Sequence, residues 1–510
     1  MKLNYKRTFF VGTAFFLICL FWQTYDAIIP KILTDKFGMS QFWSGAIMAF
    51  DNILTLFMLP LFGAISDKHK GKRGKRTPFI VFGTIVAAIA FLGLSVVDNI
   101  QLSKIDDIAA VTDSASEDYE SAMTTLYDSD VTITVDGKEA PLSSFIEKES
   151  FLALEDSSDE YAELVVPARQ AYAAEVTSNN GIILVAFIAM LLVVLVAMAT
   201  FRSPAVALMP DVTLKPLRSK ANAVINLMGS AGGILILIAG IIFGTGKASN
   251  ALMNYIPVFA VTSTLMLLAL AVFLFNVKEP QFVAEMQQES ERLGLDQAEE
   301  NVGGDRKLTG AEMRSLIFIL ASVVFWFMGY NAVTSKYSVY ASNVLRLDFN
   351  LTLIIAQAAA IIAFIPVGML ASKIGRKKSI LIGVALLGGA LVAASFIEAG
   401  CNIWIINILF TIAGIGWATI NVNSYPMVVE MSKGSNIGKY TGYYYTASMA
   451  AQTITPILSG KLLDSVGMRT LFPYAAIFVF LAFVTMLFVK HGDNRPPKNT
   501  SKLESLDVDI

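Results

Sequence analysis

The sequence predicts an all-α membrane protein of twelve transmembrane helices, arranged as two six-helix bundles with pseudo-two-fold symmetry. Three observations support this prediction. The 510-residue chain is 55% hydrophobic and 16% charged, with a mean hydropathy of +0.60, whereas soluble chains are usually about 25% charged. Roughly twelve apolar runs reach the length of about 20 residues that a bilayer core requires. Features of the first half also recur in the second half in the same order. These values argue against a water-soluble enzyme.

The apolar runs set the expected membrane spans. The first run lacks the small-residue cleavage site of a signal peptide and continues through Trp22, Tyr25 and Asp26, so we expect it to remain as the first helix. The expected spans are 8–30, 41–66, 78–97, 181–209, 219–245, 252–276, 314–341, 351–372, 379–397, 402–427, 438–463 and 470–490.

Lysine and arginine gather in alternate loops between these spans, including 68–76 and 373–378. The positive-inside rule places such loops in the cytoplasm. We therefore expect both termini to be cytoplasmic and the protein to lie in the cell membrane.

One loop differs from the others in length and charge. Residues 98–179 carry 19 acidic and 4 basic side chains, a net charge of −15, and fall on the expected outer side. Within them, residues 131–138 alternate and then turn at Asp136-Gly137, a pattern that predicts a small hairpin. We expect a folded extracytoplasmic insert flanked by helices; the alternative is a disordered acidic loop.

These features divide the chain into five expected regions. The polar segment 277–313, rich in Glu and Gln, reads as a cytoplasmic linker between the halves. The regions are a first bundle (1–97 and 180–276), the insert (98–179), the linker (277–313), a second bundle (314–491) and a cytoplasmic tail (492–510).

An internal duplication relates the halves. Residues 199–233 align without gaps on residues 418–452, which places Arg202 on Asn421 and Asp211 on Glu430. In the same way Tyr25-Asp26-Ala27 matches Tyr330-Asn331-Ala332. Secondary transporters are commonly built from such repeats, with the substrate site between them at the bilayer midplane.

The loop between the second and third helices carries a specific resemblance. Gly63-Ala-Ile-Ser-Asp67, followed by Lys72-Arg73-Gly74-Lys75-Arg76-Thr77-Pro78-Phe79-Ile80, resembles the corresponding loop of major facilitator superfamily transporters. It is similar in particular to the form found in the sucrose-transporter branch. The resemblance implies alternating-access transport of a glycoside or oligosaccharide. The residues expected to form the cytoplasmic motif and its gate are Gly63, Asp67, Arg73, Arg76, Asp211 and Glu430.

Three ionisable residues stand out deep inside the expected spans of the first half. They are Asp26, Asp51 and Arg202, and the repeat counterparts of Asp26 and Arg202 are neutral. Intramembrane charges are costly and usually functional. We therefore expect charge to be confined to the first half and to couple protons to transport. Two alternatives are a fixed Asp/Arg pair that holds helices together and a sodium site that adds Asn52.

The second half is rich in amides and aromatic rings along the helices expected to line a central cavity. Rings cover the apolar face of a pyranose, and amides pair with its hydroxyls. Helix packing is the alternative role for any one of these side chains. The candidate sugar-binding residues are Trp326, Tyr330, Asn331, Gln357, Trp417, Asn421, Asn423 and Gln452.

Together these observations predict a proton-coupled sugar symporter that is not an enzyme. Two cysteines and two histidines give no material for a disulfide framework or a metal cluster, so we expect no cofactor other than the coupling ion, a proton. The expected partners are a small solute and the lipid bilayer, with no nucleic acid, and the expected state is a monomer. The alternative functions are a proton-driven exporter of amphipathic compounds and a transporter-like sensor.

Overall fold

The structure is a computed structural model that describes residues 3–135, 137–155, 158–214, 217–293, 308–431 and 437–492, apart from the side chains of Ser219, Ile365, Ser372 and residues 437–439. Asp136 of the expected hairpin turn and the expected tail beyond residue 492 lie outside this description.

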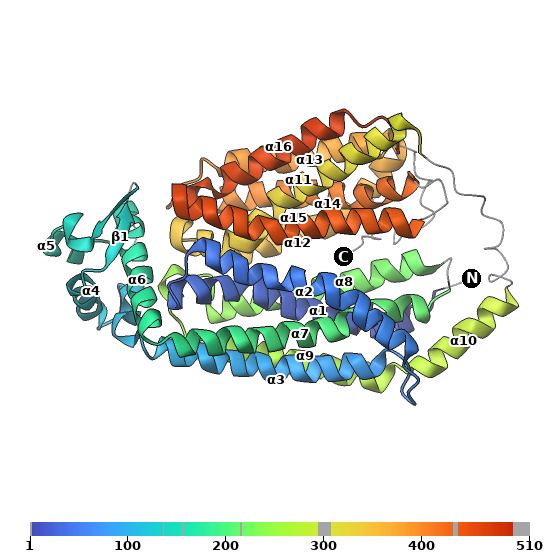
Figure 1. The fold of residues 1–510 in the computed structure, drawn as a ribbon, viewed down its shortest axis with the longest axis horizontal. Helices are drawn as coiled ribbons and strands as arrows, with labels where there is room; N and C mark the ends of the chain where they lie inside the picture. The colour runs from blue at the N-terminus through green and yellow to red at the C-terminus, as the bar shows by residue number, and fades with distance from the viewer. Residues whose placement is uncertain are drawn as a thin grey trace.

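Two helical bundles lie side by side along their length (Figure 1). In the described part of the chain, six long helices form the first bundle and six form the second. Among the described residues, ten helices are long and apolar enough to cross a membrane. The first bundle contains α1 (Tyr5–Lys31), α2 (Gln41–Lys68), α3 (Thr77–Leu102), α7 (Gly181–Asp211), α8 (Arg218–Phe243) and α9 (Ile256–Asn276). The second contains α11 (Gly310–Tyr340), α12 (Phe349–Ile374), α13 (Arg376–Ala394), α14 (Ile403–Glu430), α15 (Ile437–Val466) and α16 (Leu471–Leu487). The expected all-helical membrane fold is confirmed.

Small residues bring equivalent helices together in both bundles. A Cβ on Gly83 of α3 would lie 2.8 Å from the carbonyl oxygen of Ala197 in α7. A Cβ on Gly383 of α13 would lie 2.8 Å from the carbonyl oxygen of Gly416 in α14. Only glycine allows such close backbone contact, which is how helices commonly pack in membranes. The duplication seen in the sequence is therefore also present in the packing.

The first helix of each bundle continues into a π-helical turn. η1 (Ile32–Lys36) extends α1, and η7 (Ala341–Leu345) extends α11. All five residues of η1 are buried, including Asp35 and Lys36, which the sequence placed in a loop after the first span. This extension carries charged side chains into the protein interior.

The insert is a folded unit at one end of the bundles (Figure 1). Its hairpin is present, with Val135 opposite Lys138 in an antiparallel pair. The insert has its own apolar core, which includes Met123, Leu126, Phe151 and Val165, so its described residues do not form a disordered loop. Its elements are η2 (Asp106–Thr112), α4 (Tyr119–Asp128), β1 (Thr132–Val135), β2 (Lys138–Pro141), η3 (Leu142–Ser144), α5 (Lys148–Leu152) and α6 (Asp159–Asn179).

The linker contains a helix at the opposite end of the bundles, α10 (Glu279–Arg292) (Figure 1). Arg7 of α1 forms an ion pair with Glu285 of α10 at 3.3 Å, and its guanidinium lies 4.2 Å from the centre of the Phe282 ring. Ser315 of α11 meets His491 at 2.9 Å, close to the last described residue. Both ends of the described chain thus reach this end of the molecule. Short 3-10 turns at η5 (Ala248–Asn250) and η8 (Met468–Thr470) complete the connections.

Candidate functional site

A cavity of about 410 Å³ lies between the two bundles. Gln23, Asp26 and Ser230 contribute to its wall from the first bundle, and polar side chains of α11, α12 and α14 contribute from the second. Apolar side chains continue the wall into the second bundle, among them Leu353, Ile361, Phe364, Leu387 and Phe410. The cavity therefore has a polar end at the interface of the bundles and an apolar arm.

Two aromatic rings, Tyr330 and Trp417, stack face to face in this cavity, and we call this pair the platform. The rings of Tyr330 and Trp417 are parallel within 1° and their centroids lie 3.6 Å apart. Phe327 meets the Trp417 ring edge-on at 5.3 Å. Such contacts restrict the orientation of a ring, so the platform presents a fixed apolar surface to a bound solute.

Amides stand beside the platform. The Nε2 atom of Gln357 donates a hydrogen bond of 2.6 Å to Oε1 of Gln23, which joins the two bundles across the cavity. The Nδ2 atom of Asn331 is buried and has no hydrogen-bond partner among the described residues. Because an unsatisfied buried donor is costly, Asn331 is suited to bind a solute hydroxyl or a water.

Only some of the residues expected to bind solute meet at this cavity. Tyr330, Asn331, Gln357 and Trp417 line it together with Asp26. The other four lie outside the lining that the described residues form. Trp326 is fully buried, the side-chain amide of Asn423 donates to the Thr419 carbonyl at 2.9 Å, Asn421 accepts from Ser424 through its carbonyl oxygen at 3.5 Å, and the Gln452 carbonyl accepts from Asn52 at 3.5 Å.

Gln23 was missed by the sequence reasoning, although a signal was present. It precedes Asp26 by three residues in an apolar run, and residues three apart share a helix face. The same spacing that marks Asp26 therefore also marks Gln23.

The three charged candidates do not form a fixed ion pair. In the described residues no salt bridge joins Arg202 to Asp26 or Asp51, but the three charges are close enough to interact electrostatically. Asp51 accepts a hydrogen bond of 3.3 Å from Thr55, and the guanidinium of Arg202 lies 5.4 Å from the Trp22 ring centre. Asp26 is solvent-exposed in the cavity. This conformation therefore does not contain the fixed Asp/Arg pair that was the alternative role for these residues.

Buried charge is not confined to the first half, and that expectation is wrong. Lys336 of α11 has no exposed surface, and its ammonium donates to the carbonyl oxygen of Gln41 at 2.7 Å. Lys31, the repeat counterpart of Lys336 by the same alignment, is equally buried. Lys36 and Asp98 form a salt bridge of 2.7 Å with neither side chain exposed. Lys31, Lys36 and Asp98 lie just beyond the ends of the expected spans 8–30 and 78–97. Lys336 falls inside the expected span 314–341 and was overlooked as an intramembrane charge.

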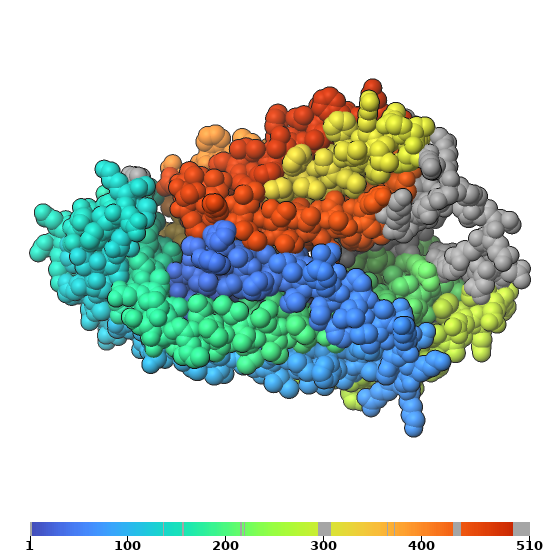
Figure 2. Space-filling view, viewed as in Figure 1, coloured from blue at the N-terminus to red at the C-terminus, as the bar shows by residue number. Residues whose placement is uncertain are grey.

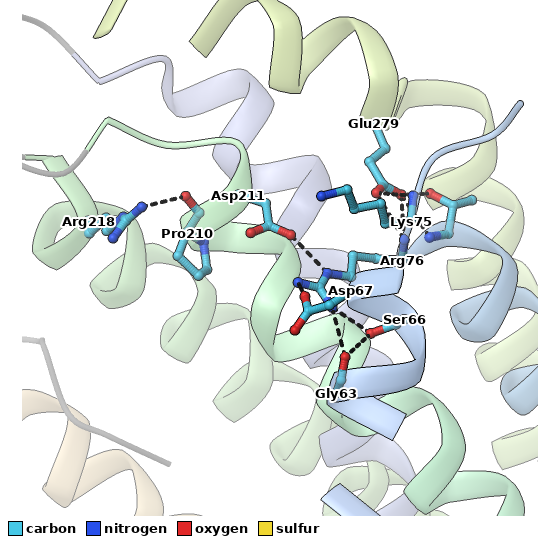
Figure 3. Close-up of polar contacts among 10 residues, drawn as sticks. Gly63, Ser66, Asp67, Lys75, Arg76, Pro210, Asp211, Arg218 and Glu279 are labelled. Atoms are coloured by element: carbon cyan, nitrogen blue, oxygen red, sulfur yellow. Dashed lines mark hydrogen bonds and ion pairs between the residues drawn. The ribbon is translucent and has the colours of Figure 1, made fainter. Parts of the chain in front are cut away.

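An ion-pair cluster joins three helices at the linker end, and we call it the linker-end latch (Figure 3). Arg76 donates from Nε to Asp211 at 2.8 Å and from its terminal nitrogens to Asp67, Ser66 and the Gly63 carbonyl. Burial opposes the charge of Arg76, but the hydrogen bonds and charges of Asp211 and Asp67 outweigh it and raise the pKa of the guanidinium. Arg73, in the same loop, is exposed.

The other bundle has an equivalent pair. Arg376, at the start of α13, forms an ion pair with Glu430, at the end of α14. Glu430 is the repeat counterpart of Asp211. The structure thus brings together five of the six expected motif residues in two equivalent latches and leaves Arg73 on the surface.

Two repeated bundles, a cavity between them and paired latches define a transporter of the alternating-access type. The chain belongs to the major facilitator superfamily: the family description Major Facilitator Superfamily matches residues 171–397 and 346–508. A second description, MFS/sugar transport protein, matches residues 11–107. The protein is therefore a secondary transporter that moves a small solute across a membrane, not an enzyme.

Solved structures of other transporters share the fold. The inward-open xylose transporter XylE from E. coli is 14% identical with a TM-score of 0.57, over 99% of each chain. A D-xylose-proton symporter is 15% identical with a TM-score of 0.56, over 96% of this chain and 99% of that one. The nucleoside transporter NupG is 13% identical with a TM-score of 0.51, over 96% of this chain and 100% of that one. At these identities the likeness concerns the fold alone. No curated protein matches the chain.

Proposed function

We propose that the protein imports a sugar, as a glycoside or oligosaccharide, together with protons by alternating access. In this proposal it resides in the cell membrane with both termini cytoplasmic and acts as a monomer, and it is a member of the sucrose-transporter branch that its 63–80 segment resembles. The match of residues 11–107 to a sugar transport family supports a sugar as the solute.

One observation carries the proposal. A carboxylate, three amides and a stacked ring pair share one cavity between the bundles: Asp26, Gln23, Gln357, Asn331 and the Tyr330–Trp417 platform. Rings beside hydrogen-bonding amides suit a neutral polyol. A carboxylate in the same cavity can take up a proton when the solute binds, which links the two events.

The roles of the charged residues follow from their positions. Asp26 exchanges protons with the cavity, while Arg202 attracts the Asp26 carboxylate and Asp51 repels it. Protonation of Asp26 would release the electrostatic attraction of Arg202 and permit the bundles to reorient. Asn331, Gln357 and Trp417 would hold the solute, with Gln23 as their partner across the cavity.

An uptake screen in proteoliposomes tests the proposal. Labelled mono- and disaccharides and aryl glycosides are offered with and without an inwardly directed proton gradient. We expect accumulation of at least one of them only with the gradient, and acidification of the lumen when that sugar is added. Uptake of none of the sugars, or accumulation unaffected by the gradient, would contradict sugar import or proton coupling respectively.

The apolar arm favours a second candidate function, the export of amphipathic compounds. Leu353, Ile361, Phe364 and Phe410 offer a surface that a simple sugar does not use. Dye extrusion from vesicles with an opposed proton gradient distinguishes the two directions. Extrusion of amphipathic cations without any sugar uptake would favour the exporter.

A further inference from the structure

One helix of the insert contacts both bundles at a single buried carboxylate. Arg169 of α6 donates from Nη2 to Oδ1 of Asp35 at 3.0 Å, and the two side chains are 3% and 0% exposed. Gln170, the next residue of α6, donates to the same oxygen at 3.1 Å. Asn343 of the second bundle donates to it at 2.9 Å and accepts from Arg169 at 3.4 Å. Asp35 thus joins the first bundle, the second bundle and the insert.

The contact between Asp35 and Asn343 joins equivalent places of the two repeated bundles. Asp35 lies in η1 and Asn343 in η7, the two π-helical turns that end the first helix of each bundle. The hydrogen bond from Asn343 to Asp35 joins these two turns directly, and the insert that reaches them lies at one end of the two bundles (Figure 1). Residues of the insert therefore reach the place where the bundles themselves come together.

The backbone of the insert also rests directly on this junction. Gly38 has φ +63°, and a Cβ there would lie 2.2 Å from the amide nitrogen of Ala174 in α6. Gln101 donates to the Lys36 carbonyl at 2.9 Å and to Thr177 of α6 at 3.0 Å. The chain directly after η1 is therefore packed against α6, so a movement of η1 would press on α6.

Other bonds between the bundles lie at the same end. Lys31 donates to Ser342 at 3.1 Å, and Lys336 donates to the Gln41 carbonyl at 2.7 Å. Asp464 of α15 accepts from the first amides of α2, Gln41 and Phe42, each at 2.7 Å. In this conformation the bundles are closed at the insert end, and Figure 2 shows them in contact beside the insert.

Alternating access requires this closed end to open in the opposite state. We propose that Arg169 and Asp35, with Asn343, form a clasp by which the insert holds the carrier closed on its own side of the membrane. This insert clasp goes beyond the proposed function: it depends only on alternating access, and on neither sugar nor proton. The insert is then a working part of the transport cycle.

Burial gives the clasp its strength. Removal of Arg169 would leave the Asp35 carboxylate inside the protein without its counter-charge, which is strongly unfavourable. In the open state the same carboxylate could be hydrated. Loss of Arg169 therefore shifts the equilibrium toward the state that is open at the insert end.

Side-specific thiol labelling tests the clasp. Both native cysteines are first removed by Cys19→Ala and Cys401→Ala. A single cysteine is then introduced by Thr334→Cys, at a half-buried residue that lines the cavity. A reference sample that carries Ser121→Cys in the insert shows which side of the membrane the insert faces. The membrane-impermeant maleimide is then added from that side. We expect Arg169→Ala to raise the labelling rate at position 334 by about tenfold or more, as loss of a hydrogen bond to a buried charge predicts. Asn343→Asp, which puts a second carboxylate beside Asp35, should act in the same direction.

A matched control separates the clasp from general loosening. Arg469 of the second bundle meets Asp159 of the insert at 3.8 Å, but both side chains are well exposed, so Arg469→Ala should leave the labelling rate unchanged. Unchanged labelling in both Arg169→Ala and Asn343→Asp, or an equal rise in Arg469→Ala, would overturn the proposal. If Arg169→Ala does not yield monodisperse protein, Asn343→Asp and Asn343→Ala carry the same test. Because labelling needs no solute, failure of the sugar proposal would not affect its outcome.

Discussion

The two bundles carry equivalent ion pairs at the linker end and different side chains at their centre. Arg76 pairs with Asp211 in the first bundle, as Arg376 pairs with Glu430 in the second. At the cavity, however, Asp26 of the first bundle stands where the second has Asn331. Duplication thus preserved an ion pair between the third and fourth long helices of each bundle, while the residues at the centre are charged in one half and neutral in the other.

A second difference lies where the last helix of each bundle ends. In the first bundle, Glu279 accepts hydrogen bonds from the amides of Lys75, Arg76 and Thr77 at the start of α3, at 2.6 to 3.1 Å. In the second, Lys377 of α13 donates to the carbonyls of Leu487 and Val489 at the end of α16. In the first half, the acid Glu279 accepts from backbone amides at a helix start. In the second half, the base Lys377 donates to backbone carbonyls at a helix end. Equivalent contacts between helices can therefore be built with opposite charge.

The largest effects are expected at Asp26 and Arg202, because these charged residues at the centre have neutral counterparts in the second bundle. Asp26→Asn should abolish accumulation of solute against its gradient while downhill exchange persists, because the neutral side chain mimics the protonated acid. Arg202→Ala should stop both, since it leaves two acids without a nearby cation. Exchange and gradient-driven uptake are measured in the same proteoliposome preparation.

The repeat counterpart supplies the control for this prediction. Asn331→Ala should weaken solute binding yet leave the dependence of accumulation on the proton gradient in place. If Asp26→Asn and Asp51→Asn both accumulate solute as the parent does, neither acid carries the proton and the charged half has another role.

The shared latch predicts the next largest effect. Arg76→Ala removes contacts to Asp67, Ser66, Asp211 and the Gly63 carbonyl, and should cost about 3 kcal/mol of stability, as expected for a largely buried charged group. Arg73→Ala, in the same loop but exposed, should change stability by less than about 0.5 kcal/mol. Unfolding midpoints in detergent compare the two variants, and equal midpoints would show that the latch does not stabilise this conformation.

The neutral half predicts a smaller effect on binding. Trp417→Ala removes half of the ring platform and should weaken solute binding by about tenfold, near 1.4 kcal/mol. Asn421→Ala should weaken it by about twofold or less, because Asn421 lies outside the cavity lining. Titration of the transported solute against both variants measures this, and a larger loss in Asn421→Ala would move the site toward the Glu430 end of α14.

The sequence was sufficient for the fold because membrane spans are long and apolar, and their count and order survive errors of a few residues at each end. It was insufficient at the insert end. The segment 32–36 lies beyond the first expected span, 8–30, yet it forms a buried π-helical turn whose Asp35 pairs with Arg169. A partner that lies 134 positions away leaves no local signal in the pattern.

The cavity shows the same limit in another form. Trp326 precedes Tyr330 by one helical turn, and spacing alone puts both on one face. Tyr330 reaches the cavity and Trp326 is fully buried among apolar side chains, because the packing of the neighbouring helices decides where the cavity ends. In a membrane helix both surroundings select similar residues, so periodicity cannot separate a cavity wall from a packed core.

Apart from the control substitutions, the smallest effect is expected where the second bundle departs from the first. Lys377→Met keeps the apolar stem of the side chain but removes the ammonium that donates to Leu487 and Val489 at 2.9 and 2.6 Å. One of these bonds is exposed to solvent, and water can replace a donor there, so we expect a loss of about 0.5 to 1 kcal/mol. The unfolding midpoint of Lys377→Met should therefore lie between those of Arg73→Ala and Arg76→Ala. A midpoint as low as that of Arg76→Ala would mean that the second bundle relies on this lysine as heavily as the first relies on its latch. The two halves would then differ in which joint stabilises them, as well as in their central chemistry.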